Sequence, residues 1–475
     1  MVFTHLVQTV GLVFFMSVFS GAQGPATETP AGRQLAGWLA AYDSTSWDAY
    51  LKFLQTNFVT PPGGGFQDPS LRDRTGGYDL KKIELENSTQ VTALVQERAG
   101  DGFARLTLEV EPVEPHRILK LDVNLAERPA EFALPHMSNT QLTAALRKQL
   151  DNEASADRFA GAVLVANEGK PLFAQAYGLA DREHKIPNTL QSRFTIASMN
   201  KMFTAVATMQ LVQAGKLALD DPLGKYLTDY PNKELAAKVT IGELLTNTGG
   251  TGDIWGPEFD KHRLELRTLQ DYINLYGNRA LRFEPGSRWE YSNYGFILLG
   301  AVIEKVSGEN YYNYVREHVY LPAGMTSTPS GMEDKAIPNR SINYTKMGSA
   351  HWIPNTDTLI NTGTPAGGGY STVGDLLRFA DALRENKLLD AHYTTLLTTG
   401  RVATPFGLEA YGFGVQTVNG NKCFGHNGSS RGVNGDLEMC LDSSYTVVVL
   451  ANVDPPAAEQ ISQFIIGRLS ATKPK

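Results

Sequence analysis

The sequence Ser198-Met199-Asn200-Lys201 opens an apolar segment that continues over residues 202–212. The spacing of three predicts that the serine and the lysine lie on one face of a helix, about one turn apart. An unassisted serine hydroxyl is a weak nucleophile and needs an adjacent base. Burial disfavours the ammonium form of lysine, so a buried amine can serve as that base near neutral pH. The segment therefore predicts a serine acyl-transfer site at the start of a helix, where the helix dipole favours the developing alkoxide.

Two further polar motifs follow, each beside an apolar segment. Tyr291-Ser292-Asn293 precedes an apolar helix predicted over 295–303, and His426-Asn427-Gly428 ends a strand-like run near the C-terminus. Each motif alone has an ordinary explanation. S-x-x-K is commonly a helix cap followed by a surface lysine, Tyr291 can be a packed aromatic, Asn293 can cap the following helix, and His426 can be a hydrogen-bonded strand residue. The order of all three motifs favours catalysis.

The ordered set of S-x-x-K, Y-x-N and a basic residue two positions before glycine resembles the serine β-lactamase and penicillin-binding protein superfamily. The tyrosine in the second motif makes the chain similar to one branch of this superfamily. That branch contains class C β-lactamases, D-alanyl-D-alanine carboxypeptidases, esterases and D-aminopeptidases. The resemblance covers residues 139 to 470, more than half of the chain. It implies an α+β, β-lactamase-like fold in which an antiparallel sheet is flanked by helices and carries a helical subdomain.

The resemblance also implies a role for each motif residue. Ser198 attacks a carbonyl carbon and forms an acyl-enzyme that water hydrolyses, with Lys201 and Tyr291 as the other catalytic residues. Whether Lys201 or Tyr291 is the general base stays open, because a tyrosine with a reference pKa near 10 needs positive charge beside it, from Lys201 or His426. The substrate-binding residues implied are Asn293, His426, Gly428 and Ser429, and the backbone N–H groups of Ser198 and Ser429 form the oxyanion hole.

The chain departs from the family pattern at two places. His426 replaces the lysine of many β-lactamases, which exchanges a fixed cation for a group that titrates near physiological pH. Asn247 and Gly249 replace a histidine and a serine in the loop that relatives usually read as L-L-S-H-T-S-G. A glycine-rich segment at 365–371 does match the family, and it predicts close approach of the backbone to a neighbour. The substrates compatible with this pattern are β-lactams, D-amino-acid peptides and small esters.

The region before the motifs is predicted to form a separate domain. Residues 33–124 contain apolar residues at helical spacing and then strand-like runs, which predicts a small α+β accessory domain. The strands are predicted at 91–96, 103–110 and 118–123. This domain faintly resembles nuclear transport factor 2-like (NTF2-like) domains and carries no chemistry. Residues 125–137 are expected to form a linker, and the hydrolase domain is expected over 138–470, beginning with a capping box at Ser138.

Residues 1–22 are expected to form a signal peptide. Residues 10–19 are apolar and too short for a comfortable membrane span, and Ser20-Gly21-Ala22 supplies small residues for cleavage. The first residues contain no lysine or arginine, so an uncleaved anchor stays an alternative. We expect a secreted or periplasmic protein without a stable membrane span in the mature chain. A net charge of −7 gives no basic footprint for nucleic acid.

The chain has two cysteines, Cys423 and Cys440, on either side of a predicted hairpin. A disulfide in an oxidising compartment and a pair of small buried hydrophobic side chains are equally compatible with this placement. The histidines are scattered, so we expect no metal site and no cofactor. The oligomeric state stays open. A catalytically silent penicillin-binding-like sensor is the alternative function, which the intact Ser198, Lys201 and Tyr291 argue against.

Overall fold

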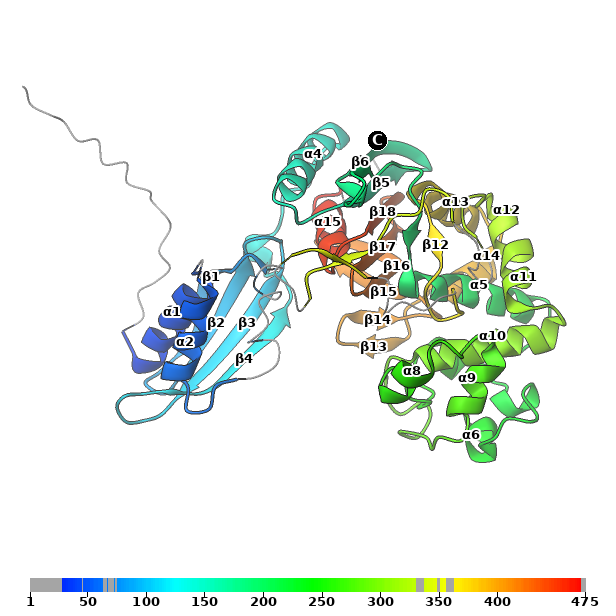
Figure 1. Ribbon diagram of the computed structural model, residues 1–475, viewed down its shortest axis with the longest axis horizontal. Helices are drawn as coiled ribbons and strands as arrows, with labels where there is room; N and C mark the ends of the chain where they lie inside the picture. Colours follow the sequence, from blue (N-terminus) through cyan, green and yellow to red (C-terminus); the bar gives the residue numbers. More distant parts are fainter. Residues whose placement is uncertain are drawn as a thin grey trace, which may run out of the picture. The chain divides into compact units, whose positions relative to one another are not determined.

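The computed structural model describes residues 28–470, apart from 45, 63–65, 67–71, 73–74, 330–336, 348–350 and 356–362. The predicted signal peptide at 1–22 lies outside the described residues. The chain divides into two compact units, Met1–Glu127 and Arg128–Lys475 (Figure 1). Among the helices described, none is long and apolar enough to cross a membrane.

In the described part of the first unit, the helices α1 and α2 accompany an antiparallel sheet in the order β1-β2-β3-β4 (Figure 1). Its elements are α1 (Pro30–Tyr42), α2 (Trp47–Asn57), β1 (Tyr78–Glu86), β2 (Gln90–Glu97), β3 (Phe103–Val110) and β4 (Ile118–Ala126). Trp38, Tyr42 and Tyr50 are buried between the helices and the sheet. The sequence did not predict β1, because charged residues and two register shifts interrupt its alternation. The resemblance to NTF2-like domains stays a prediction.

The second unit is built on an eight-stranded antiparallel sheet in the order β13-β14-β15-β16-β17-β18-β5-β6. The strands are β5 (Gly161–Asn167), β6 (Lys170–Tyr177), β13 (Val402–Thr404), β14 (Gly407–Glu409), β15 (Gly414–Val418), β16 (Asn421–Ser430), β17 (Val433–Cys440) and β18 (Tyr445–Ala451). β18 pairs with β5 from Tyr445↔Asn167 to Ala451↔Gly161. The two ends of this unit therefore meet in one sheet, which confirms the predicted β-lactamase-like α+β fold.

Helices cover both faces of this sheet (Figure 1). The helices of the unit are α4 (Asn139–Ser155), α5 (Asn200–Gln213), α6 (Lys233–Lys238), α7 (Ile241–Leu245), α8 (Pro257–His262), α9 (Leu269–Tyr276), α10 (Asn293–Ser307), α11 (Tyr311–Val315), α12 (Leu321–Ala323), α13 (Val373–Arg384), α14 (Ala391–Thr398) and α15 (Ala457–Ile466). Alternate residues of β18 face opposite sides: Val448 lies in the core cluster that contains α5, and Val449 in the cluster that contains α4 and α15. The predicted capping box of α4 is present at Ser138 and Gln141.

The remaining strands described in this unit are short. They are β7 (Leu179–Asp181), β8 (Ile186–Pro187), β9 (Phe194–Thr195), β10 (Tyr344–Thr345), β11 (Ile353–Pro354) and β12 (Tyr370–Ser371). β12 pairs with β9, immediately before the S-x-x-K motif. The glycine-rich segment and the motif are thereby brought together from distant parts of the sequence.

Cys423 and Cys440 lie directly opposite each other in β16 and β17 and form a disulfide. The structure thus favours the first of the two alternatives that the sequence left open. The bond closes a loop with a sequence separation of 17. Loop-closure entropy predicts that replacing both cysteines by serine lowers the free energy of unfolding by about 3 kcal/mol.

Urea unfolding of the oxidised protein and of the double serine variant measures this loss. Wild-type protein that has been reduced and alkylated is the control, and it should unfold at the lower urea concentration of the variant. Coincident unfolding curves for oxidised and reduced protein would contradict the prediction.

Candidate active site

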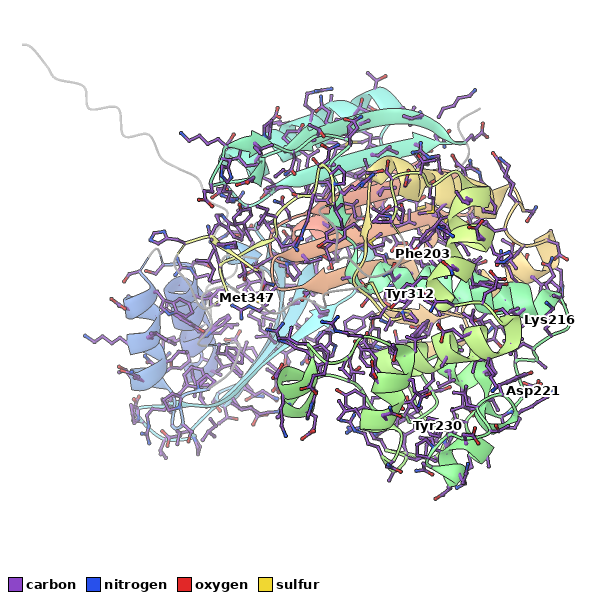
Figure 2. The ribbon with its side chains drawn as sticks, turned by 45° about the vertical axis from the view of Figure 1, so that its right-hand side comes forward. Phe203, Lys216, Asp221, Tyr230, Tyr312 and Met347 are labelled. Atoms are coloured by element: carbon purple, nitrogen blue, oxygen red, sulfur yellow. A yellow bond between two sulfur atoms is a disulfide. The ribbon has the colours of Figure 1, made fainter. Side chains whose placement is uncertain are left out.

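Ser198 lies in a short 3-10 turn, Ala197–Met199, which leads directly into α5. The residue before it, Ala197, has a φ of 45°, a conformation that is uncommon for a residue with a side chain. The turn leaves the Ser198 side chain partly exposed, whereas α5 behind it is buried. Phe203, labelled in Figure 2, fixes this helix by packing edge-on against Tyr320 and Phe379, with centroid distances of 5.1 and 4.8 Å.

Lys201 is completely buried in the first turn of α5. Its Nζ lies 3.3 Å from Ser198 Oγ, 2.7 Å from Asn293 Oδ1 and 2.5 Å from the carbonyl oxygen of Ala366. Burial lowers the pKa of Lys201 to about 7, although Asp253 and Glu409 act in the opposite direction. The predicted serine–lysine pair is therefore in contact, with the amine close to half neutral at pH 7.

The partners of Lys201 determine where its lone pair points. The oxygens of Asn293 and Ala366 can only accept hydrogen bonds, so they take both N–H groups of a neutral amine. The lone pair is then left for the third partner, the hydroxyl of Ser198. An ammonium group would donate to all three partners, so the same geometry also holds the protonated lysine.

Tyr291 lies two residues before the start of α10, and the nearby Ser198 side chain acts on the pKa of its phenol in the direction opposite to burial. Lys201 Nζ is 4.7 Å from the centre of the Tyr291 ring. Burial raises the pKa of Tyr291 above its ordinary value, so the phenol is protonated at neutral pH. A neutral Lys201 amine can accept a proton, and the protonated Tyr291 phenol can donate one.

The His426 ring lies 6.5 Å from the Tyr291 ring. Burial and the nearby charge of Lys201 lower the pKa of His426 to about 4. The ring is consequently neutral at pH 7. This shift disfavours the expectation that His426 supplies positive charge to Tyr291, because a second cation beside Lys201 is unfavourable.

Asn293 is held on both sides. Its Oδ1 accepts from Lys201, while its Nδ2 and backbone N–H donate to Asp253 at 3.1 and 2.9 Å. The cap of α10 is Ser292, whose Oγ accepts from Gly295 N at 2.9 Å. The alternative that Asn293 is merely the helix cap is therefore wrong.

Gly428 brings β16 against the turn that carries the serine. A Cβ atom at this position would overlap the carbonyl oxygen of Ile196 and lie 3.2 Å from Met199 Cγ. The next residue, Ser429, is fixed through its side chain, which donates to Glu459 at 2.9 Å and accepts from Asn434 Nδ2 at 3.1 Å. The third motif thus lies beside the Ser198 turn, as its predicted role requires.

The glycine-rich segment at 365–371 forms another side of the site. The carbonyl oxygen of Gly369 accepts a hydrogen bond from Ile196 N at 3.1 Å, and the carbonyl oxygen of Gly368 accepts one from Asn200 Nδ2 at 3.0 Å. Gly369 has a φ of +67°, and a Cβ there would lie 2.9 Å from Asn200 Nδ2. The predicted close approach of this backbone is confirmed.

Two acidic residues that the sequence did not single out act electrostatically on Lys201, namely Asp253 and Glu409. Asp253 follows the loop that contains Asn247, and Glu409 comes from the three-residue strand β14. Neither position has a motif that could have identified it. Among the residues that the structure describes, no group of three or more His, Cys, Asp or Glu side chains could hold a metal ion.

A serine and a lysine in contact at the start of a buried helix, beside the strand β16 of an antiparallel sheet, define a class of serine acyl hydrolases. The family model described as Beta-lactamase matches residues 142–471, and the chain belongs to this family. Membership of this family, together with the enzymes among its relatives, identifies the chain as a serine acyl hydrolase related to β-lactamases.

Three relatives illustrate the range of the family. The putative penicillin-binding protein PbpX of Bacillus subtilis is 30% identical over 297 residues, covering 62% of this chain and 70% of that protein. Esterase EstB of Burkholderia gladioli is 34% identical over 212 residues, covering 42% and 53%. The crystal structure of a D-stereospecific amidohydrolase from Streptomyces sp. superposes with a TM-score of 0.60 at 26% identity, covering 70% of this chain and 99% of that one.

Proposed function

We propose that this protein hydrolyses an amide or ester carbonyl through an acyl-enzyme on Ser198. The observation that carries the proposal is the Lys201 amine, which donates to two carbonyl oxygens and lies 3.3 Å from Ser198 Oγ. This arrangement supplies the adjacent base that a serine nucleophile needs. The catalytically silent alternative has no observation in its favour.

The proposed reaction has two steps. Lys201 takes the Ser198 proton while Oγ bonds to the carbonyl carbon, and the negative charge on the carbonyl oxygen is stabilised by the backbone N–H groups of Ser198 and Ser429. The C–N or C–O bond then breaks, the Tyr291 hydroxyl protonates the leaving group, and the proton on Lys201 replaces the one Tyr291 gave. In the second step water attacks the acyl carbon and gives one proton to Lys201. The bond between the acyl carbon and Ser198 Oγ then breaks, Oγ takes that proton from Lys201, and the acid is released.

The electrostatics favour a neutral substrate at the third motif. His426 is neutral at pH 7, so it offers no fixed cation for a substrate carboxylate. We therefore favour D-amino-acid amides and small carboxylic esters over a β-lactam, in line with the amidohydrolase and esterase relatives. A panel of p-nitrophenyl esters, D- and L-amino-acid amides and penicillin G tests this choice. Higher kcat/KM for penicillin G than for every ester and amide would contradict it.

Two proposals concern the rest of the chain. Residues 1–22 direct export as a signal peptide, which accords with a disulfide between Cys423 and Cys440. Residues 33–124 act as an accessory domain, joined through a linker at 125–137 to the hydrolase domain at 138–470. N-terminal sequencing of the secreted protein tests the first proposal, and a start that retains residues 1–22 would contradict it.

The pH dependence of kcat/KM follows from Lys201. With a pKa of about 7, the amine is protonated below neutrality and cannot accept the serine proton. For an uncharged ester, kcat/KM should therefore fall about tenfold for each pH unit below this pKa and level off above it. Initial rates with p-nitrophenyl acetate between pH 5 and 9 measure the profile, corrected with enzyme-free blanks. A flat profile through pH 7 would contradict the assignment of Lys201 as base.

A further inference from the structure

Asn247, which stands where relatives usually have a histidine, is buried and adopts a φ of 56°. Its backbone carbonyl accepts from Glu290 N at 2.9 Å, and its Oδ1 accepts from Ser292 N at 3.1 Å. These two donors are the residues immediately before and after Tyr291. One asparagine therefore fixes the backbone on both sides of the tyrosine.

The remaining group of Asn247, its Nδ2, donates to Glu409 Oε1 at 2.9 Å. Glu409 lies 162 residues further along the chain and is only 7% exposed. The turn that follows β14 packs against the end of α7, since Gly412 N donates to Leu245 O at 2.9 Å. A Cβ at Gly412 would lie 3.2 Å from the Lys201 carbonyl oxygen. The fold thus places a buried carboxyl beside the first turn of α5.

Charged and titratable groups reach Glu409 from two elements. Lys201, in α5, interacts electrostatically with the Glu409 carboxyl. Glu409 in turn interacts electrostatically with Tyr291, in the segment before α10. Asp253 acts on the same lysine and tyrosine. A negative charge on Glu409 therefore favours the ammonium form of Lys201, and its removal favours the neutral amine.

We propose that Asn247 and Glu409 are positioning residues of the active site: Asn247 fixes Tyr291, and Glu409 orients the Asn247 amide and holds a negative charge near Lys201. The inference rests on the proposed function. Burial raises the pKa of Glu409 to about 7, while its hydrogen bond with Asn247 lowers it. Glu409 and Lys201 consequently change charge over the same pH range. The two groups together therefore determine how kcat/KM falls at acidic pH.

Three variants separate the two roles. Asn247→Ala should lower kcat on the order of 10- to 100-fold with little change in KM, because a misplaced group of this kind costs up to about 10² in rate. Asn247→His offers a donor and an acceptor on its two ring nitrogens and should recover most of that loss. Glu409→Gln keeps an acceptor for Asn247 but removes the charge, so the acid limb of kcat/KM should move down by about 0.5 to 1 pH unit.

Matched controls exclude general damage. Asn386, with a φ of 55°, has the same backbone conformation as Asn247, so Asn386→Ala measures the strain alone. Glu438 is a buried carboxyl that accepts from Gln416 on the α15 face of the sheet, so Glu438→Gln should leave the acid limb in place. Thermal unfolding of each variant shows whether it is folded.

The outcomes are distinct when wild type and Ser198→Ala are assayed in the same series with p-nitrophenyl acetate. Two results together support the inference. Asn247→Ala loses more kcat than Asn386→Ala does, and the acid limb of the kcat/KM profile moves in Glu409→Gln but not in Glu438→Gln. An active wild type whose Asn247 and Glu409 variants match their controls overturns the inference and leaves the proposed function intact. A wild type as inactive as Ser198→Ala overturns both.

Discussion

Replacing Ser198 by alanine is expected to lower kcat/KM for p-nitrophenyl acetate by at least about 10³-fold, to a level set by binding and the oxyanion hole alone. The change removes the hydroxyl that lies 3.3 Å from Lys201 Nζ. Lys201 keeps its contacts with Asn293 and Ala366, so the site should stay folded. The loss should therefore appear in kcat, with unchanged thermal unfolding.

The matched control is Ser430→Ala, a serine two residues after Gly428 at the end of the same strand β16. This variant removes a hydroxyl close to the third motif and should retain nearly full activity. Ser198→Ala protein that keeps more than about a tenth of the wild-type rate would contradict the nucleophile assignment, because removal of a serine nucleophile is far more costly.

Replacing Lys201 by methionine is the second change with a large expected effect. Methionine fills a similar volume but cannot accept the serine proton, so kcat/KM should fall by about 10³-fold or more at pH 8. The remaining activity should also lose its dependence on a group with a pKa of about 7. Rate profiles of the variant and the wild type between pH 5 and 9 measure both effects.

Lys201→Arg is the matched control, since it retains a positive charge and removes the base. If Lys201 acted only as a cation, the arginine variant would keep substantial activity while the methionine variant lost it. If Lys201 is the base, both variants should be inactive. Activity in Lys201→Arg within tenfold of wild type would contradict the proposed mechanism.

The sheet was predictable where strands are long and alternate. Cys423 and Cys440 are equidistant from the β16–β17 turn, so the sequence placed them opposite each other, as the register shows. Strands β13 and β14 were not predicted, because each has three residues and periodicity cannot be seen over so short a run. The strand β1 was missed because its charged residues and bulges hide the pattern.

The site was predictable where chemistry depends on side chains in fixed motifs. Ser198 and Lys201 are three residues apart, so one helical turn brings them together. The third contact of Lys201 is a backbone carbonyl, that of Ala366, which has no side-chain signature in the sequence. The neutral state of His426 depends on burial and on the charge of Lys201, which only the folded chain determines. Glu409 was missed for the same reason, since a long-range contact brings it to the site.

The most direct test of the central claim is to trap the acyl group itself. Wild-type protein mixed with excess p-nitrophenyl acetate and quenched in acid within the first turnovers should show, by intact mass spectrometry, one added acetyl group. Peptide mapping should place this group on Ser198, and Ser198→Ala should show none. Rapid hydrolysis by wild-type protein without an acetyl group on Ser198, or with the group on another residue, would contradict the account.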